Sequence, residues 1–401
     1  MQSSVTRTRV LGVLAAAQVL GGIGVATGIV VGALAVRDLS GSDALAGLAQ
    51  PSAVLGAALF AVPAGVVAAR AGRRLSLAAA HGVGALGALL AACSAAAGSW
   101  PFLLVGLVLF GSGTTAILAA RFAAADDAPP GRRARDLSLV VWATTVGSVL
   151  GPNLAAPGRW AASALGLAPA AGPFLVSALA YGLAALTVLV GLDRRAPVAA
   201  TPVRGPGAWR AVRGSRPALV ALTALVVGQA VMFGVMSMTP VHMGHGAASL
   251  TAIGLVMSLH IAGMYALSPL VGWAADRRGR RVVLAAGAVL LTVSGLLVAG
   301  AHGHDLVLLA VGLTVLGIGW CCGLVAGSAL LGESVPAASR ATVQGFSDMV
   351  MNVGGALGGV AAGAAVTAWG YRGLGVAAAV VSLALLGVIA GVTSGPPSRT
   401  R

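Results

Sequence analysis

Long apolar runs alternate with short polar segments along the chain. Each run has about twenty residues or more, enough for a helix that rises 1.5 Å per residue to cross a hydrocarbon layer of about 30 Å. In lipid the backbone must satisfy its own hydrogen bonds, so these runs predict transmembrane helices. We place them at residues 10–36, 46–69, 76–97, 101–124, 137–157, 171–192, 217–239, 250–274, 282–301, 306–331, 342–366 and 373–393. The pattern therefore predicts an all-α membrane protein with twelve spanning helices.

Residues 193–216 form the longest polar stretch, with six arginines and three prolines. A stretch of this composition predicts a flexible cytoplasmic linker. It divides the chain into an N-terminal half, residues 1–192, and a C-terminal half, residues 217–401, with six helices each.

Composition excludes several classes of protein. Charged residues make up 9% of the chain, against roughly 25% in a soluble domain. The net charge of +15 would suggest nucleic-acid binding in a soluble protein, but here the arginines lie in short segments between apolar runs. We therefore expect the lipid bilayer as a partner and no nucleic acid. Cys93, Cys321 and Cys322 lie in apolar runs without disulfide or zinc spacing.

The distribution of arginine predicts the orientation in the membrane. With the N-terminus in the cytoplasm, only Arg37, Arg159 and Arg372 lie outside, as the positive-inside rule favours. The first apolar run continues to Val36, so we interpret it as a retained span and not a signal peptide. Abundant Ala, Gly and Arg without any lysine indicates a GC-rich bacterial genome. We expect a bacterial inner (plasma) membrane protein with both termini in the cytoplasm.

The two halves contain an internal repeat. Residues 65–74 read GVVAARAGRR and residues 272–281 read GWAADRRGRR, at an offset of 207. The same offset pairs Asp126 with Glu333, Pro129 with Pro336, Arg133 with Arg340, Gly147 with Gly354 and Gly151 with Gly358. One register over about ninety residues indicates duplication of a six-helix unit. Six helices separate the copies, so both insert with the same orientation, related by an axis along the membrane normal.

Two six-helix halves, a basic central loop and the motif G-x-x-x-D-R-x-G-R-R resemble the major facilitator superfamily over the whole chain. The resemblance implies a secondary transporter that rocks its two halves around a central site and needs no cofactor. It also implies a cytoplasmic gate. In this gate Asp276 would cap the fifth helix, where the helix dipole favours a carboxylate. Arg280 would pair with Glu333, and Arg73 with Asp126 or Asp127. The chain contains no nucleophile–base arrangement and no phosphate-cradling loop, so we expect neither an enzyme nor ATP-driven transport. We expect a monomer.

The first motif departs from the family because Ala69 stands where the family has Asp. Asp348 is the one acidic residue inside a predicted span. We predict that it supplies the missing carboxylate by pairing with Arg70 or Arg73.

A polar stripe runs along the eleventh helix. Gln344, Asp348 and Asn352 are spaced by four and form one face, which should line the central cavity and not meet lipid. Asp348 could be a gate residue, a proton-coupling carboxylate, or an attractor for a departing cation.

Methionine and histidine gather in the seventh and eighth helices. Six methionines fall between positions 232 and 264, with three histidines in the same stretch. Met232 and Met236 share one face of the seventh helix, and His260 and Met264 share one face of the eighth. Thioether and neutral imidazole groups suit Cu(I), although methionine is also a common packing residue.

The paired M-x-x-x-M and H-x-x-x-M motifs resemble those of the CcoA-like copper importers, a branch of the superfamily. That resemblance implies metal binding by Met232, Met236, His260 and Met264, and inward transport of copper as the substrate. His242, Met243 and His245 in the next outer loop could collect the metal. Relatives of this branch also carry riboflavin-like compounds, so a vitamin-like solute stays open as a substrate.

A second substrate class is suggested by the fifth helix. Gly147 to Asn153 resembles, in part, the Gly-Pro motif of proton-coupled exporters of amphipathic organic compounds. The same small residues could instead permit close contact with the eighth helix. A non-transporting sensor or scaffold on this fold is a further alternative.

Overall fold

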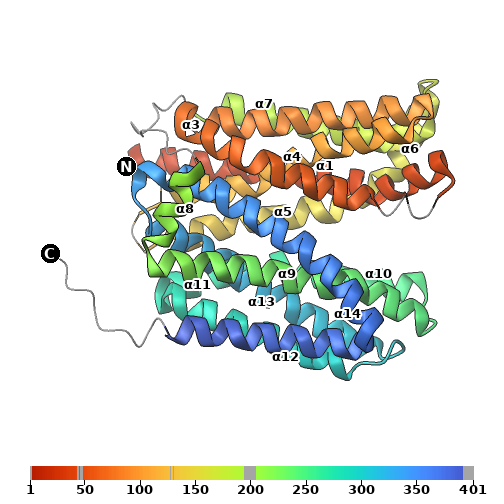
Figure 1. The fold of residues 1–401 in the computed structure, drawn as a ribbon. Coiled ribbons are helices and arrows are strands. Elements are labelled where there is room, and N and C mark those ends of the chain that lie inside the picture. The colour runs from red at the N-terminus through yellow and green to blue at the C-terminus, as the bar shows by residue number, and fades with distance from the viewer. Residues whose placement is uncertain are drawn as a thin grey trace. The chain divides into compact units, whose positions relative to one another are not determined.

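A computed structural model describes residues 2–42, 45, 48–126, 128–129, 131–193 and 205–391. These residues form helices joined by turns and short loops (Figure 1). The longer helices are α1 (Gln2–Ser40), α3 (Ala49–Ala97), α4 (Trp100–Asp126), α5 (Arg133–Asn153), α7 (Gly172–Gly191), α9 (Arg216–His245), α10 (Leu250–Tyr265), α11 (Ser268–Arg278), α12 (Arg280–Gly300), α13 (Leu306–Glu333) and α14 (Arg340–Gly391). Shorter ones are α6 (Ala155–Ala164), α8 (Gly205–Arg213) and the 3₁₀ turns η1 (Pro169–Ala171) and η2 (Ala337–Ser339).

The twelve expected spans are present among the described residues. Within the described ranges, nine helical stretches are long and apolar enough to cross a membrane, one of them formed by α10 and α11 together, and the bent pair α5–α6, with its 49° angle, makes ten. Two of these helices each contain two spans. α3 is divided at Gly72, with φ of 84°, and α14 at Gly370, with φ of 67°. Glycine tolerates this left-handed backbone, so the chain turns there without a separate loop.

The predicted linker differs from the structure in part. Residues 205–213 form the helix α8, in which Ala208 and Val212 are buried while Trp209 and Arg210 are exposed. Because Ala208 and Val212 are four residues apart, they share one buried face of this short helix. Residues 194–204 of the predicted linker lie outside the described residues.

The chain divides into two compact units, each of which takes one segment from the other half of the sequence. Unit 1 comprises Met1–Pro129, Leu139–Trp209 and Pro336–Val353. Unit 2 comprises Pro130–Ser138, Arg210–Val335 and Gly354–Arg401. The start of α14 therefore packs in unit 1, and the start of α5 packs in unit 2. The loop motifs, residues 65–74 and 272–281, lie at one end of the helices of their unit. We call that end the motif end.

Helix contacts inside the two units repeat at the offset of 207. A Cβ on Gly147 would lie 2.3 Å from the carbonyl oxygen of Val19 in α1, and a Cβ on Gly354 would lie 3.4 Å from that of Val226 in α9. Positions 19 and 226 are themselves 207 apart. The contacts therefore support the duplication predicted from sequence, because the same helix pair meets in the same register in both copies.

The small residues of α5 face α1. The atoms nearest to Gly147 and Gly151 belong to α1 and include backbone atoms of Ile23. Thr27 strengthens this contact by donating its hydroxyl to the carbonyl of Gly151 at 2.8 Å. The expectation that these glycines permit contact with the eighth helix is wrong. It is the start of α5, at Ser138, that approaches α11.

Two neighbouring glycines of α14 allow a direct test of this packing. A Cβ on Gly358 would lie 2.3 Å from the carbonyl oxygen of Ala230, whereas a Cβ on Gly359 would meet nothing within 4 Å. We expect Gly358→Ala to destabilise the protein by roughly 1–3 kcal/mol through overpacking. The matched variant Gly359→Ala should melt at or slightly above the wild-type temperature, because alanine favours a helix. Thermal unfolding of both purified variants in one detergent would check this, and equal melting temperatures would contradict it.

Candidate functional site

Asp276 caps the start of α5 inside unit 2. Its carboxylate accepts backbone N–H groups of Ala134 at 3.2 Å and Arg135 at 2.9 Å. A carboxylate at a helix N-terminus is stabilised both by these hydrogen bonds and by the helix dipole. Arg280, four residues later, holds the same carboxylate at 2.6 Å. The predicted capping contact is confirmed.

Two equivalent ion pairs flank the loop motifs. Arg280 pairs with Glu333 at 3.0 Å in unit 2, and Arg73 pairs with Asp126 at 2.9 Å in unit 1. Both pairings were predicted, and the two are related by the offset of 207. Asp127, the other predicted partner of Arg73, lies outside the described residues.

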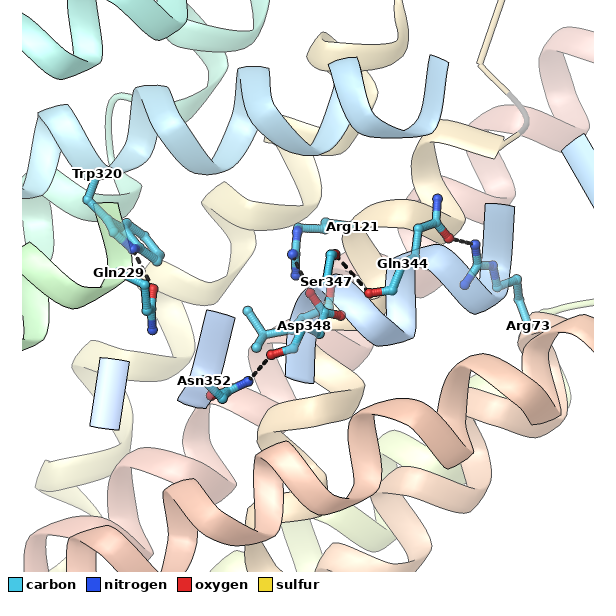
Figure 2. A network of polar contacts seen from close by, with 9 residues as sticks. Arg73, Arg121, Gln229, Trp320, Gln344, Ser347, Asp348 and Asn352 are labelled. Carbon is cyan, nitrogen blue, oxygen red and sulfur yellow. Dashed lines mark hydrogen bonds and ion pairs between the residues drawn. The ribbon is translucent and has the colours of Figure 1, made fainter. Parts of the chain in front are cut away.

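A buried charge pair joins α4 to the start of α14 in unit 1. Arg121 Nη2 lies 2.6 Å from Asp348 Oδ1, and the two side chains are 1% and 3% exposed. Figure 2 shows the guanidinium and the carboxylate pointing toward each other between the two helices. Arg121 also donates to the carbonyl of Leu118 at 2.5 Å. Burying an isolated charge in an apolar interior costs a large desolvation free energy, and the attraction between the two groups offsets part of that cost.

The predicted pairing of Asp348 with Arg70 or Arg73 is therefore wrong. Arg70 is exposed on α3, and Arg73 donates instead to Asp126 and to the side chain of Gln344. At 1.5 Å per residue, Asp348 lies about 12 Å along α14 from Arg340. Arg121 lies at a similar depth in α4 and so reaches Asp348 directly.

The polar stripe of α14 is buried in unit 1. Gln344, Asp348 and Asn352 are all buried, and Gln344 is tied to Arg73. The Asn352 amide donates to the backbone carbonyl of Asp348 at 2.8 Å (Figure 2). The stripe thus forms the surroundings of the charge pair. Whether its far end lines a central cavity stays a prediction.

Sequence reasoning missed Arg121, although the signal was present. The residue lies inside the predicted span 101–124, and an arginine within a span is rare and usually functional. The distribution of arginine among the loops predicts orientation only, and it does not draw attention to an arginine inside a span.

A second polar contact lies in the middle of unit 2. Trp320 Nε1 donates to Gln229 Oε1 at 2.7 Å, joining α13 to α9 (Figure 2). Tyr265 of α10 meets the Trp320 ring edge-on, with ring centroids 5.8 Å apart. Trp320 is about 20 Å from either end of α13 along the helix axis. Three helices thus bring aromatic and amide groups together at mid-span, a feature that the sequence did not reveal.

His260 faces α13. Its Nδ1 lies 2.7 Å from the carbonyl of Leu313, and its Nε2 is buried with no hydrogen-bond partner among the described residues. Met232 and Met264 are buried, and Met236 is partly exposed. The predicted convergence of these sulfur atoms and the imidazole into one metal site stays a prediction.

The residues predicted to collect metal belong to the last turn of α9 and not to a loop. Met243 is fully buried, so its sulfur is not presented to solvent as that prediction requires. The His242 ring stacks on Tyr371, with centroids 3.9 Å apart, while His245 is exposed.

Two further histidines lie beside an acidic residue between α12 and α13. His302 and His304 stack near Asp305, and the backbone N–H of His302 donates to the Asp305 carboxylate at 2.8 Å. That hydrogen bond lowers the pKa of Asp305 below its usual value. Within the described ranges, no group of three or more His, Cys, Asp or Glu side chains is arranged to hold a metal ion.

Comparison with known proteins identifies the family. A model of the Major Facilitator Superfamily matches residues 14–248 and 245–401, which is nearly the whole chain. The chain belongs to the Major Facilitator Superfamily. As a member of that superfamily it is a multi-pass secondary transporter of small-molecule substrates, it is not an enzyme, and it needs no cofactor.

Bacterial members of the superfamily are similar over most of their length. The chain is 36% identical over 391 residues to the uncharacterized MFS-type transporter YdeG of Bacillus subtilis. The aligned region covers 95% of this chain and 91% of YdeG. It is 31% identical over 356 residues to the riboflavin transporter RfnT of Brucella anthropi, covering 88% and 87% of the two chains.

Solved structures of the superfamily share the fold. FucP in the outward conformation has a TM-score of 0.75 at 18% identity, covering 96% of this chain and 99% of FucP. The proton:xylose symporter XylE has a TM-score of 0.78 at 14% identity, covering 97% and 96%. At these identities the similarity establishes the fold alone.

The Asp276 cap should contribute measurably to stability. We expect Asp276→Ala to cost about 1–2 kcal/mol, because two backbone N–H groups of α5 lose their acceptor. Asp193 provides a control, since it forms a 3.9 Å ion pair with Arg9 in which both side chains are more than half exposed. Exposed pairs contribute at most about 1 kcal/mol, so Asp193→Ala should leave the melting temperature nearly unchanged. Equal decreases in melting temperature for the two variants would show that Asp276 contributes no more to stability than an exposed charge.

Proposed function

We propose that the protein carries a planar, vitamin-like organic solute of the riboflavin type across the membrane by alternating access. The observation that carries this proposal is the mid-span cluster of Gln229, Trp320 and Tyr265 in unit 2. The similarity to RfnT, named a riboflavin transporter, supports the same class of substrate.

The chemistry of the cluster suits a planar heteroaromatic ring. Trp320 and Tyr265 can contact such a ring by stacking or by an edge-to-face approach. Trp320 engages the amide oxygen of Gln229 at 2.7 Å, which leaves the amide NH₂ group as a donor for a solute carbonyl. Transporters with this kind of repeat bind substrate near the middle of the bilayer, at the depth of these residues.

Comparison of the two copies shows that the residues of this cluster are not repeated in the first copy. Subtracting 207 from Trp320 and Gln229 gives Gly113 and Gly22, both of which serve close packing in unit 1. A Cβ on Gly113 would lie 2.2 Å from the Tyr181 ring, and a Cβ on Gly22 would lie 3.1 Å from the Cα of Gly147. The second copy therefore carries polar and aromatic side chains where the first carries none. Such a difference is expected of residues that serve substrate recognition and not the fold.

Riboflavin uptake by a riboflavin-auxotrophic bacterium that expresses the protein tests this proposal. We expect labelled riboflavin to accumulate, and Trp320→Ala and Gln229→Leu each to lower the initial rate by about tenfold or more, equivalent to about 1.4 kcal/mol of lost binding. Trp160→Leu is the matched control, since this tryptophan is 75% exposed and should not matter. Absence of uptake by a protein present at normal levels, or equal rates in all variants, would overturn the proposal.

Copper import is a second candidate, favoured by one specific observation. The Nε2 atom of His260 is buried without a partner among the described residues, and Met264 lies buried one turn further along α10. A buried imidazole nitrogen of this kind can ligate a soft metal ion together with thioether sulfur. The CcoA-like prediction for Met232, Met236, His260 and Met264 therefore remains testable, with copper moving inward.

Copper accumulation in cells separates the two candidates. If copper is the substrate, His260→Ala and Met264→Leu should abolish the copper taken up above that of empty-vector cells, as measured by mass spectrometry. Met257→Leu, on the same helix and outside the motif, should leave it unchanged. Equal copper content in cells with and without the wild-type protein would reject copper while leaving the riboflavin measurement unaffected.

The exporter alternative has lost its main support. It depended on the glycines between Gly147 and Asn153, but these face α1. The second copy makes the same kind of contact through Gly354 and Gly358, so packing alone accounts for them. Inward direction, a cytoplasmic motif end and a monomeric state remain predictions.

A further inference from the structure

Three of the differences between the two copies concern the capping carboxylate and the buried charge pair. Ala69 corresponds to Asp276, Arg121 to Ser328, and Asp348 to Val141. At these positions, one copy thus has the capping carboxylate and two uncharged residues, whereas the other has the charged pair and an alanine in place of the capping aspartate.

The backbone approach beside positions 69 and 276 is equivalent in the two copies. A Cβ on Gly65 would lie 2.9 Å from the carbonyl of Ala341, and a Cβ on Gly272 would lie 2.6 Å from that of Ala134. Ala341 and Ala134 are again 207 apart. Ala69 follows Gly65 by one turn, as Asp276 follows Gly272. An aspartate at position 69 would therefore lie where its carboxylate could cap the start of α14.

The other copy has no charge at the positions of the buried pair. The equivalent positions of the other copy are filled by Ser328 and Val141, which carry no charge and are both buried. Placing two charges within a membrane-spanning region is costly even when they are paired. A costly feature that one copy of the scaffold lacks is expected to have a role beyond folding.

We propose that Arg121 and Asp348 form a lock that replaces the missing capping carboxylate of the first motif and holds the start of α14 against α3 and α4. The lock joins residues from the two halves of the sequence, as the Asp276 cap does. Rocking of one repeat against the other during transport must break such contacts in each cycle. The strength of the pair therefore sets how much of the time the start of α14 stays packed in unit 1.

The neighbouring charges fit this role. Arg73, which lies toward the helix end, pairs with Asp126 and donates to Gln344, one turn before Asp348 on α14. The first copy thus holds α14 at two levels, through Gln344 near the motif end and through Asp348 deeper in the span. In the second copy, Asp276 acts directly on the backbone of α5.

Alkylation of a single cysteine in the absence of any solute tests the lock. Thr342 is 3% exposed at the start of α14, so in a background without the native cysteines Thr342→Cys should react slowly with a maleimide. The double variant Arg121→Ser/Asp348→Val installs the residues that the other copy uses. We expect it to fold and to raise the labelling rate by about tenfold, equivalent to about 1.4 kcal/mol. Adding Ala69→Asp should return the rate to near the starting value, because it restores a capping carboxylate.

Controls separate the lock from a general loss of packing. The exposed pair Arg9–Asp193 gives the matched double variant Arg9→Ser/Asp193→Val, which should leave the labelling rate unchanged. If Arg121→Ser/Asp348→Val is poorly produced, the near-isosteric Arg121→Gln/Asp348→Asn takes its place with the same expectation. An unchanged rate in a folded double variant, or no reversal by Ala69→Asp, would overturn the proposal. These results do not depend on which solute is carried, so they stand apart from the riboflavin measurement.

Discussion

Close approach of helix backbones at small residues is the constraint on which the structure depends. In lipid there is no hydrophobic gain from pressing two apolar helices together, so packing must come from short contacts between small side chains. The chain makes such contacts twice in the same register: α1 meets α5 at Gly147 as α9 meets α14 at Gly354. The two copies therefore share one packing scheme.

Two departures from this repeat place polar side chains in contact within the spans. Arg121 and Asp348 form a buried charge pair where the other copy has uncharged residues. Trp320 and Gln229 form a polar contact at positions where the first copy has glycine. The proposed roles in gating and recognition are assigned to these unshared contacts. In a duplicated transporter, comparison of corresponding residues in the two copies thus distinguishes contacts shared by both copies from contacts found in one copy.

The sequence predicted those features that depend only on spacing along the chain. The spans, the duplication, and the contacts of Asp276 with α5 and of Arg280 with Glu333 all follow from motif and register. The partner of Asp348 could not be predicted in this way, because it depends on the rotation and relative depth of α4 and α14. The same holds for His260, whose spacing from Met264 defines a helix face but not the neighbour it meets, which is α13. Met243 was predicted to lie in an outer loop, but α9 continues to His245 and so includes it.

Hydrogen exchange at the two helix starts tests most directly whether the Arg121–Asp348 pair holds the start of α14. Backbone amides of residues 340–348 and of the equivalent residues 133–141 would be followed by mass spectrometry in the wild-type protein and in the Arg121→Ser/Asp348→Val variant. The account predicts faster exchange at the start of α14 alone, with the start of α5, capped by Asp276, unchanged. Equal exchange in both proteins, or equal acceleration at both helix starts, would contradict it.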